Sequence, residues 1–237
     1  MPSKVNKAAT PVARDLSVIG IRRPPWLDDI LVPWRICAQR ILVVADGLDF
    51  NESNGFGLTR FLLALALHAA EDRLAVLVGQ VDALIIAAIE RDANSVKDYD
   101  VAGATRLAVL KLVGYTEAVH VLADRLTPTA SIVLFGGLAM MRPYPGSTTV
   151  TTVNGGVSAM VRTLASELAP VRVNAVHPGI VGDSPAWEDK DLSMVIARTP
   201  IGRTVTMDEI VGATLFLLDN GGVNGQNLMV EGGVLVR

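Results

Sequence analysis

The chain has 237 residues, of which half are hydrophobic and 19% are charged, and its formal net charge is −3. This length and composition are typical of one ordered globular domain with a sizeable core. The weak negative charge, without a lysine- or arginine-rich run, argues against binding to nucleic acid. No apolar stretch reaches bilayer length, and Cys37, the only cysteine, excludes an intrachain disulfide. We therefore expect a cytoplasmic protein that does not enter a membrane.

Residues 1–40 combine several prolines with a mild excess of basic residues. We interpret this segment as an N-terminal arm that packs on the domain or on a partner subunit. Within it, residues 16–21 have the β-branched composition of an edge strand. An organellar presequence is disfavoured, because Asp15, Asp28 and Asp29 interrupt the basic character.

Residues 41–45, ILVVA, predict a buried parallel strand, and residues 58–70 predict a helix after it. The connection between them contains Gly47, Gly55 and Gly57. Closely spaced glycines in a strand-to-helix turn let backbone N–H groups approach a phosphate. The same connection brings carboxylates that oppose an anionic ligand; they are Asp46, Asp49 and Glu52.

The next strand is predicted at residues 82–88, DALIIAA. Residues 74–78 also have the composition of a strand. The few residues between the two segments cannot form a parallel crossover, which needs a dozen or more. We therefore predict that residues 58–79 are helical.

The second half of the chain alternates helices and strands, as a parallel α/β sheet requires. Apolar periodicity predicts two long helices at residues 103–125 and 150–168, each with more apolar side chains than one buried face needs. Short β-branched runs predict further strands at 131–135, 171–176 and 228–230. The loop that opens at Pro178 and Gly179 follows a strand end, where open α/β sheets place their ligands.

The helix at 150–168 and the segment RVNAVHPG at 172–179 resemble the short-chain dehydrogenase/reductase family, as does the closing segment PIGRTVTMDEIVGATLFLLDNGG. The resemblance covers residues 101–233. It implies a single domain over residues 41–237, an α/β fold with a Rossmann-like doubly wound parallel sheet and helices on both faces. The sheet is shortened, because the family's second and third strands have no counterpart here. Five core strands remain, at 41–45, 82–88, 131–135, 171–176 and 228–230.

The resemblance implies NAD or NADP as the cofactor. The positions that would bind it are Gly47, Gly55, Gly57, Pro178, Gly179 and Ile180. Seven residues separate Gly47 from Gly55, more than in the family pattern. Gly79 and Gln80 supply neither the acidic residue expected for NAD nor the arginine expected for NADP. The half of the site that would hold the adenosine therefore departs from the family.

The family's catalytic serine, tyrosine and lysine are absent from their positions. The serine falls on the pair Gly136-Gly137, the tyrosine on Val150 and the lysine on Asn154. In the family, the lysine ammonium lies one helical turn from the tyrosine and lowers the pKa of the phenol that protonates a carbonyl oxygen. The family's relay asparagine is replaced by Lys111.

Three residues are candidates for a substitute catalytic site: Tyr144, Lys111 and Asn154. An ammonium within roughly 4–6 Å favours phenolate, so a pair formed by Tyr144 and Lys111 would restore the family's electrostatics. We expect both side chains to point into one cleft beside Gly136 and Pro178. The alternatives are that Tyr144 is an aromatic residue of a loop and that Lys111 is a solvated surface lysine.

Two further features near this site have structural interpretations. His177 precedes the Pro-Gly loop, where an imidazole could act as an acid or a base, and it is the third titratable candidate beside Tyr144 and Lys111. We interpret it instead as a histidine whose ring is satisfied by loop backbone. No second ligand lies at metal-binding spacing, so no metal site is predicted. Asn154 and the neighbouring threonines could hydrogen-bond a small polar ligand; the alternative is that the residues from Ser147 to Thr151 only cap the helix.

Two functions remain open at this stage. The chain is either an NAD(P)-dependent oxidoreductase of small carbonyl or alcohol substrates with a degenerate active site, or a catalytically silent structural or regulatory subunit, a pseudoenzyme. In both cases we predict a homo-oligomer, or an assembly with a homologous subunit, through helices 103–125 and 150–168. The small residues Gly155, Gly156, Ser158 and Ala159 would allow the partner's helices to approach closely.

Overall fold

A computed structural model describes residues 17–19, 41–44, 80–90, 92–187 and 189–236. The rest of the N-terminal arm, the glycine loop with Gly47, Gly55 and Gly57, and the helix predicted at 58–79 lie outside the described residues. The described residues include the whole segment from the strand at 81–86 to the last strand, apart from single positions, and this segment contains the candidate catalytic residues.

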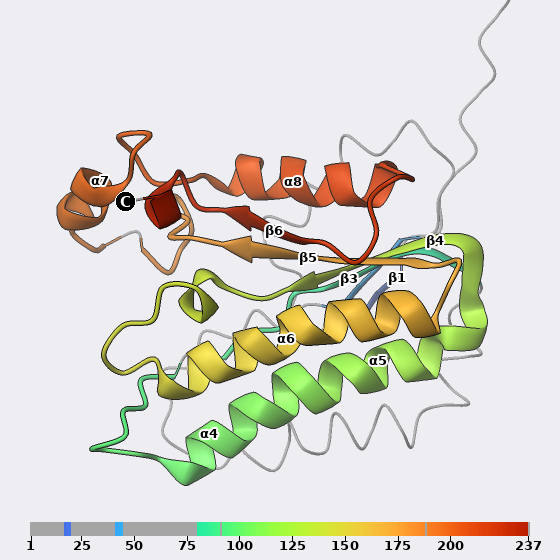
Figure 1. Ribbon diagram of the computed structural model, residues 1–237, viewed down its shortest axis with the longest axis horizontal. Coiled ribbons are helices and arrows are strands. Elements are labelled where there is room, and N and C mark those ends of the chain that lie inside the picture. Colours follow the sequence, from blue (N-terminus) through green and yellow to red (C-terminus); the bar gives the residue numbers. More distant parts are fainter. Residues whose placement is uncertain (1–16, 20–40, 45–79, 91, 188, 237) are drawn as a thin grey trace, which may run out of the picture.

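The described strands form one six-stranded sheet in the order β1-β2-β3-β4-β5-β6, and every neighbouring pair is parallel (Figure 1). All five predicted core strands are present, and the segment predicted as an edge strand adds β1 next to β2. The bounds are β1 Ser17–Ile19, β2 Ile41–Val44, β3 Val81–Ile86, β4 Leu126–Phe135, β5 Arg172–Pro178 and β6 Asn227–Val230.

Strand β4 begins five residues before the predicted start at Ser131. Its first residue pairs with Val81, and the register then shifts so that Ser131 pairs with Ala83. The Thr127 hydroxyl, in this irregular stretch, donates a 2.9 Å hydrogen bond to the Asp82 carboxylate. A proline in the stretch, Pro128, interrupts the apolar pattern that marks the rest of the strand, so the sequence shows only its regular part.

The long helix predicted at 103–125 is one helical run with a break in its hydrogen-bond pattern. It consists of α4 (Val101–Ala108), the π-helical turn η2 (Val109–Val113), α5 (Gly114–Leu122) and the 3₁₀ turn η3 (Ala123–Arg125). The helix predicted at 150–168 is α6, Thr148–Glu167. The remaining helical elements are η4 Leu138–Met140, α7 Ser193–Arg198, α8 Met207–Asp219 and η5 Val234–Val236.

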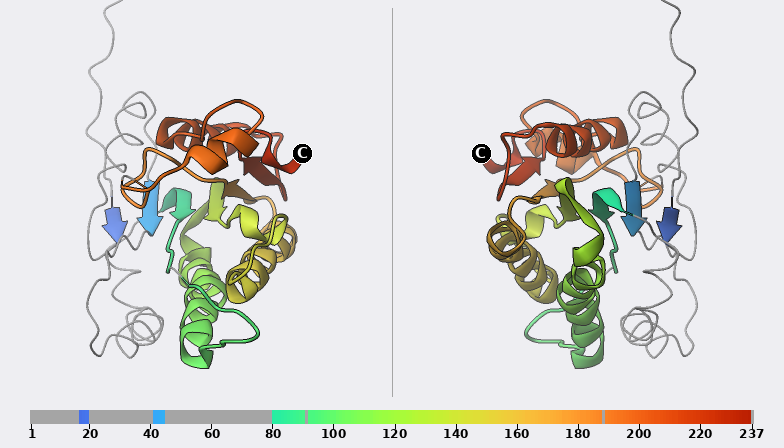
Figure 2. Two further views of the ribbon diagram at one scale, coloured as in Figure 1. Left: turned by 90° about the vertical axis from the view of Figure 1, so that its left-hand side faces the viewer. Right: turned by 90° about the vertical axis from the view of Figure 1, so that its right-hand side faces the viewer.

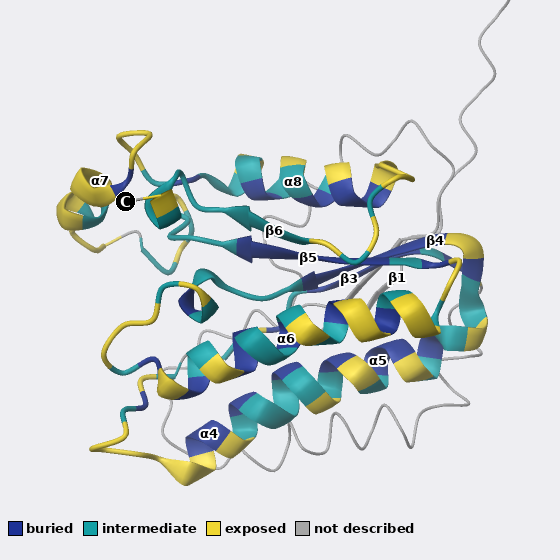
Figure 3. Ribbon diagram, in the orientation of Figure 1, coloured by how far each residue is buried: buried dark blue, intermediate teal, exposed yellow. Residues whose placement is uncertain are grey.

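Helices cover both faces of the sheet, as the end-on views show (Figure 2). The run α4–α5 lies beside α6 on one face, and α8 lies on the other. Successive strand residues point to opposite faces, so Ile132 packs against α5 and α6 whereas Val133 packs against α8. The central strands are therefore buried on both sides (Figure 3), which explains their nearly continuous apolar sequences.

None of the described helices is long and apolar enough to cross a membrane.

The contact between α6 and the π-helical turn corrects one expectation about the small residues of α6. A Cβ atom at Gly156 would lie 2.7 Å from Cδ2 of Leu112, so the missing side chain makes room for a residue of the same chain. Gly155 has no neighbouring atom within 4 Å of the same position. Gly156 therefore allows close packing against Leu112 of the same chain, a role that the sequence did not indicate.

This contact predicts different effects for two neighbouring glycines. Gly156→Val should destabilise the fold by about 1–3 kcal/mol, because the added atoms overlap Leu112 in a packed interface. Gly155→Ala is the matched control and should stabilise the helix by up to about 1 kcal/mol. Urea denaturation of both variants checks this, and equal midpoints would contradict the packing described.

Candidate active site at the carboxyl end of the sheet

The candidate site lies at the carboxyl ends of the central strands, on the side of the sheet where η4 and α7 are found (Figure 1). The chain leaves β4 at Gly136 and leaves β5 after Pro178, and α6 begins nearby at Thr148. Ligands of open α/β sheets bind at this edge, because the connecting loops there diverge from the ends of the strands.

The two glycines after β4 are fixed by the side chains that face them. A Cβ atom at Gly137 would lie 2.7 Å from Nδ2 of Asn154, and one at Gly136 would overlap the His177 ring. A serine could therefore not be accommodated at residue 137 unless Asn154 moved. The absence of the family's serine is thus physically coupled to the asparagine at the family's lysine position.

His177 is fully buried and has both ring nitrogens engaged. Its Nδ1 accepts a 3.1 Å hydrogen bond from the backbone N–H of Gly137, so Nε2 carries the proton and donates to Oδ1 of Asn227 at 2.8 Å. The Asn227 amide in turn donates to the carbonyl of Ser158. Burial, together with the Lys111 charge, lowers the pKa of His177. The interpretation of His177 as a histidine satisfied by loop backbone is confirmed.

Lys111 is the one buried residue of the π-helical turn, and only 3% of it is exposed. Its ammonium donates a 2.8 Å hydrogen bond to the carbonyl of Phe135 and a longer one, 3.4 Å, to the carbonyl of Gly136. The alternative of a solvated surface lysine is therefore wrong. A π-helical turn changes the side-chain register of a helix and is frequent at functional sites. Burial lowers the pKa of Lys111 from 10.5 to about 8.

Tyr115, one helical turn after Lys111, shares the carbonyl of Phe135. Its buried phenol donates to the carbonyls of Ala88 at 2.8 Å and Phe135 at 3.1 Å. Burial raises the pKa of the phenol, so Tyr115 remains protonated. The Lys111 ammonium lies 5.7 Å from the centre of the ring. Nothing in the sequence pattern distinguishes Tyr115 from an ordinary core aromatic residue.

The expected pair of Tyr144 and Lys111 is not formed. The Tyr144 side chain is 56% exposed, and its backbone, rather than its phenol, is bound by the hydroxyl of Ser147. No interaction between Tyr144 and Lys111 occurs in the described part of the chain. Tyr144 lies between Pro143 and Pro145, and all three residues are exposed. The interpretation of Tyr144 as an aromatic residue of a loop fits this geometry better.

The hydroxyl groups at the start of α6 bind one another and the preceding loop. Ser147 occupies the N-cap position but makes no capping hydrogen bond, which contradicts its interpretation as a cap. It lies instead 2.9 Å from the hydroxyl of Thr151, which also contacts the carbonyl of Ala139 at 3.2 Å. Thr149 is buried, and its hydroxyl has no hydrogen-bond partner among the described residues. Val150, at the family's tyrosine position, is half-buried.

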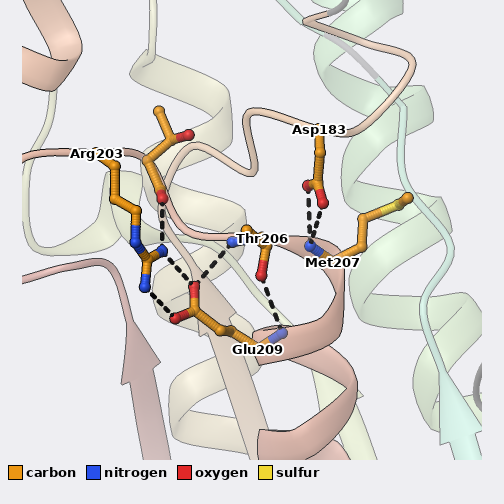
Figure 4. A network of polar contacts seen from close by, with 6 residues as sticks. Asp183, Arg203, Thr206, Met207 and Glu209 are labelled. Atoms are coloured by element: carbon orange, nitrogen blue, oxygen red, sulfur yellow. Dashed lines mark hydrogen bonds and ion pairs between the residues drawn. The ribbon is translucent and has the colours of Figure 1, made fainter.

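The loop after β5 is held to the start of α8 (Figure 4). The Asp183 carboxylate accepts hydrogen bonds of 2.9 and 3.2 Å from the backbone N–H of Met207. Thr206 and Glu209 form a capping box, and Arg203 binds the Glu209 carboxylate at 2.7 Å. These contacts fix both ends of the segment that contains α7.

The positions predicted to bind a cofactor are only partly described. Pro178 ends β5, the N–H of Gly179 binds the carbonyl of Val230 at 2.9 Å, and Ile180 is half-buried. A Cβ atom at Gly179 would lie 3.0 Å from Cα of Glu231, so this glycine allows close approach of the last strand. Among residues 80–90, 92–187 and 189–236, no group of three or more histidine, cysteine or acidic side chains is arranged to hold a metal.

Comparisons with known proteins identify the family. Residues 65–235 match a family model described as enoyl-(acyl carrier protein) reductase. A 3-oxoacyl-(acyl-carrier-protein) reductase of Thermotoga maritima is 30% identical over 170 residues, which cover 67% of this chain and 68% of that protein. With the fold described above, these matches show that the chain belongs to the short-chain dehydrogenase/reductase family, an oxidoreductase family.

Other relatives match over shorter segments. A (2S)-(R-hydroxy(phenyl)methyl)succinyl-CoA dehydrogenase subunit of Thauera aromatica is 39% identical, but the match covers only 37% of this chain and 38% of that protein. Among solved structures, a small-chain dehydrogenase has a TM-score of 0.75 at 23% identity, covering 95% of this chain and all of the other. This last likeness shows the fold alone.

The buried ammonium predicts that Lys111→Met stabilises the protein. A pKa lowered from 10.5 to about 8 corresponds to up to about 3 kcal/mol of folding free energy lost at pH 7. The unfolded state binds the extra proton between pH 8 and 10.5, so the wild-type protein should recover stability over that range. The advantage of the methionine variant should therefore be largest below pH 8.

Thermal denaturation of both proteins at several pH values measures this difference. The exposed Lys97 is the matched control, because Lys97→Met removes a charge that is already solvated and should leave the stability nearly unchanged. A methionine variant at residue 111 that is less stable at every pH would show that the hydrogen bonds to Phe135 and Gly136 outweigh the desolvation.

Proposed function

We propose that this protein is a catalytically silent member of the short-chain dehydrogenase/reductase family, which keeps the fold for assembly and ligand binding. The observation that carries the proposal is the state of the titratable groups around Val150 and Asn154. The phenol of Tyr144 is exposed, His177 has both ring nitrogens engaged, and the Lys111 ammonium is bound to strand-end carbonyls. None of these described groups is placed as a proton donor beside residue 150.

NAD or NADP is the ligand that family membership supports. A small-chain dehydrogenase of the same fold has been solved in complex with NADPH. In this chain the nicotinamide end would contact Pro178, Gly179 and Ile180, with Gly47, Gly55 and Gly57 on the phosphates. The chemistry that such a cofactor supplies is hydride transfer, for which this chain provides no positioned acid among its described residues. The lone Cys37 is compatible with a cytoplasmic location.

A second candidate function is an oxidoreductase of small carbonyl or alcohol substrates that uses an unusual proton donor. The position of the Lys111 ammonium, at the carboxyl end of the central strand β4, is the observation that favours it. Cofactor titration and turnover measurements separate the two functions.

The first test is turnover with a broad panel of ketones, aldehydes and alcohols in the presence of NADH, NADPH and their oxidised forms. We expect no appreciable nicotinamide turnover, because loss of a positioned general acid alone lowers rates by about two to four orders of magnitude. Fluorescence titration of both reduced cofactors, run in parallel, distinguishes a protein that binds without reacting from one that does not bind. Robust turnover that survives Val150→Ala and Asn154→Ala would overturn the silent function and place the acid elsewhere.

The second test concerns assembly through helices 103–125 and 150–168. Val119 and Leu122 are buried in the protein's own core, so they are not available to contact a partner subunit. Val113 on the π-helical turn is 56% exposed, and Gly155 faces open space on α6. We expect a dimer at micromolar concentration by light scattering, and we expect Val113→Glu to weaken it because a charge would be buried at the interface. A monomeric wild-type protein would rule out this interface.

A further inference from the structure

The Lys111 ammonium is buried, and no counter-ion for it is found among the described residues. Its hydrogen-bond acceptors are two neutral carbonyls, one of them at the long distance of 3.4 Å, and no carboxylate in the described part of the chain forms an ion pair with it. Charged groups in protein interiors are normally paired, because desolvation is otherwise uncompensated. The carbonyl of Phe135 is already satisfied by Tyr115, so the lysine is not needed there as a donor.

Asn154 is a second buried polar residue at the same place. It is 5% exposed, and its carboxamide has no hydrogen-bond partner among the described residues. Its Nδ2 lies against Gly137, at 2.7 Å from where a Cβ atom would be, and Lys111 binds the carbonyl of the preceding residue, Gly136. The ammonium and the amide therefore both adjoin the peptide that joins Gly136 to Gly137.

We propose that Lys111 and Asn154 form a binding site for the carboxylate group of a small molecule at the carboxyl end of β4. One oxygen of the carboxylate takes a hydrogen bond from the ammonium and the other takes one from the Asn154 amide. The bound carboxylate supplies the counter-ion that the described residues do not provide.

The donors fit a carboxylate better than a phosphate group. One positive charge balances one negative charge, and the two donors, an ammonium and an amide N–H, match two oxygen acceptors. A phosphate carries about two charges and is usually held by several donors, such as an arginine fork or the N-terminus of a helix. Asn154 lies in the second turn of α6, away from the free N–H groups of its first turn.

This inference does not depend on the proposed silent function, since it concerns binding and is measured without a nicotinamide cofactor. A silent protein without this site would show neither turnover nor carboxylate binding, whereas an active protein with the site would show both. The two proposals can therefore fail separately.

The experiment is a thermal-shift and calorimetric titration with sodium acetate, pyruvate and benzoate at constant ionic strength. Acetamide and ethyl pyruvate serve as neutral counterparts, and sodium chloride and phosphate as other anions. We expect at least one carboxylate to stabilise the protein in a saturable way, with no saturable effect of the neutral counterparts. The affinity should fall as the pH rises past about 8, because the ammonium loses its proton.

Three variants assign the effect to the proposed residues. Lys111→Met should weaken carboxylate binding about tenfold or more, and Asn154→Ala about two- to tenfold, as expected for charged and neutral hydrogen bonds. Asn154→Asp keeps the shape of the side chain but gives Lys111 an internal counter-ion, so it should abolish binding without loss of stability. Lys97→Met, at an exposed lysine, is the control and should bind as the wild type does.

Several results would overturn the proposal. They are the absence of any carboxylate effect beyond that of chloride, an equal effect of phosphate and the carboxylates, and carboxylate binding that persists in both Asn154→Asp and Lys111→Met. If Lys111→Met does not fold, Asn154→Asp alone tests the proposal. The side-chain carboxylate of the Asn154→Asp variant would compete with the added carboxylate for Lys111, so persistent binding in this variant would contradict the proposal.

Discussion

The end of strand β4 imposes the constraint on which the site depends. This strand is buried on both faces over residues 130–134, and its last carbonyl, that of Phe135, lies where the chain leaves the sheet. Two side chains of the neighbouring helical run, Tyr115 and Lys111, donate hydrogen bonds to this carbonyl. The π-helical turn at 109–113 includes Lys111 as its only buried residue. The local irregularity of the helix and the buried charge are therefore parts of one arrangement.

The residues that replace the family's catalytic groups fit one another. Asn154 lies against residue 137, so glycine is the residue that fits there, and His177 does the same at residue 136. His177 also accepts a hydrogen bond from the backbone of Gly137 and connects it, through Asn227, to α6. A serine restored at residue 136 or 137 would meet a steric conflict with His177 or Asn154. The residues at the altered positions therefore pack against one another and form a well-packed site.

Family membership and the site answer different questions about the chain: the first concerns its lineage and the second its chemistry. The family match and the parallel sheet establish the lineage and the edge of the sheet where a ligand would bind. Fold does not fix the reaction, which depends on the side chains at that edge. Here those side chains are a bound histidine, a buried ammonium and an unpartnered amide. Such a set suits recognition of a polar group better than proton transfer to a carbonyl oxygen.

The sequence by itself determined the order of strands and helices, the parallel sheet and the residues missing from the family's catalytic positions. These follow from local patterns, because apolar periodicity and β-branched runs are properties of contiguous residues. It also indicated the structural role of His177. The early start of β4 was not predictable, since Pro128 interrupts the pattern there and the pairing depends on another strand.

Only the tertiary structure decided where the long side chains go. Lys111 resembles any surface lysine in a helical sequence, and only the π-helical turn and its contact with the end of β4 show that it is buried. It donates there to the carbonyl of Phe135, which lies 24 residues further along the chain. The same dependence on tertiary structure holds for Gly156, whose neighbour Leu112 comes from a separate helix, and for Tyr144, which is exposed. Contacts between residues distant in sequence carry no local signal, because they form only when the sheet brings the elements together.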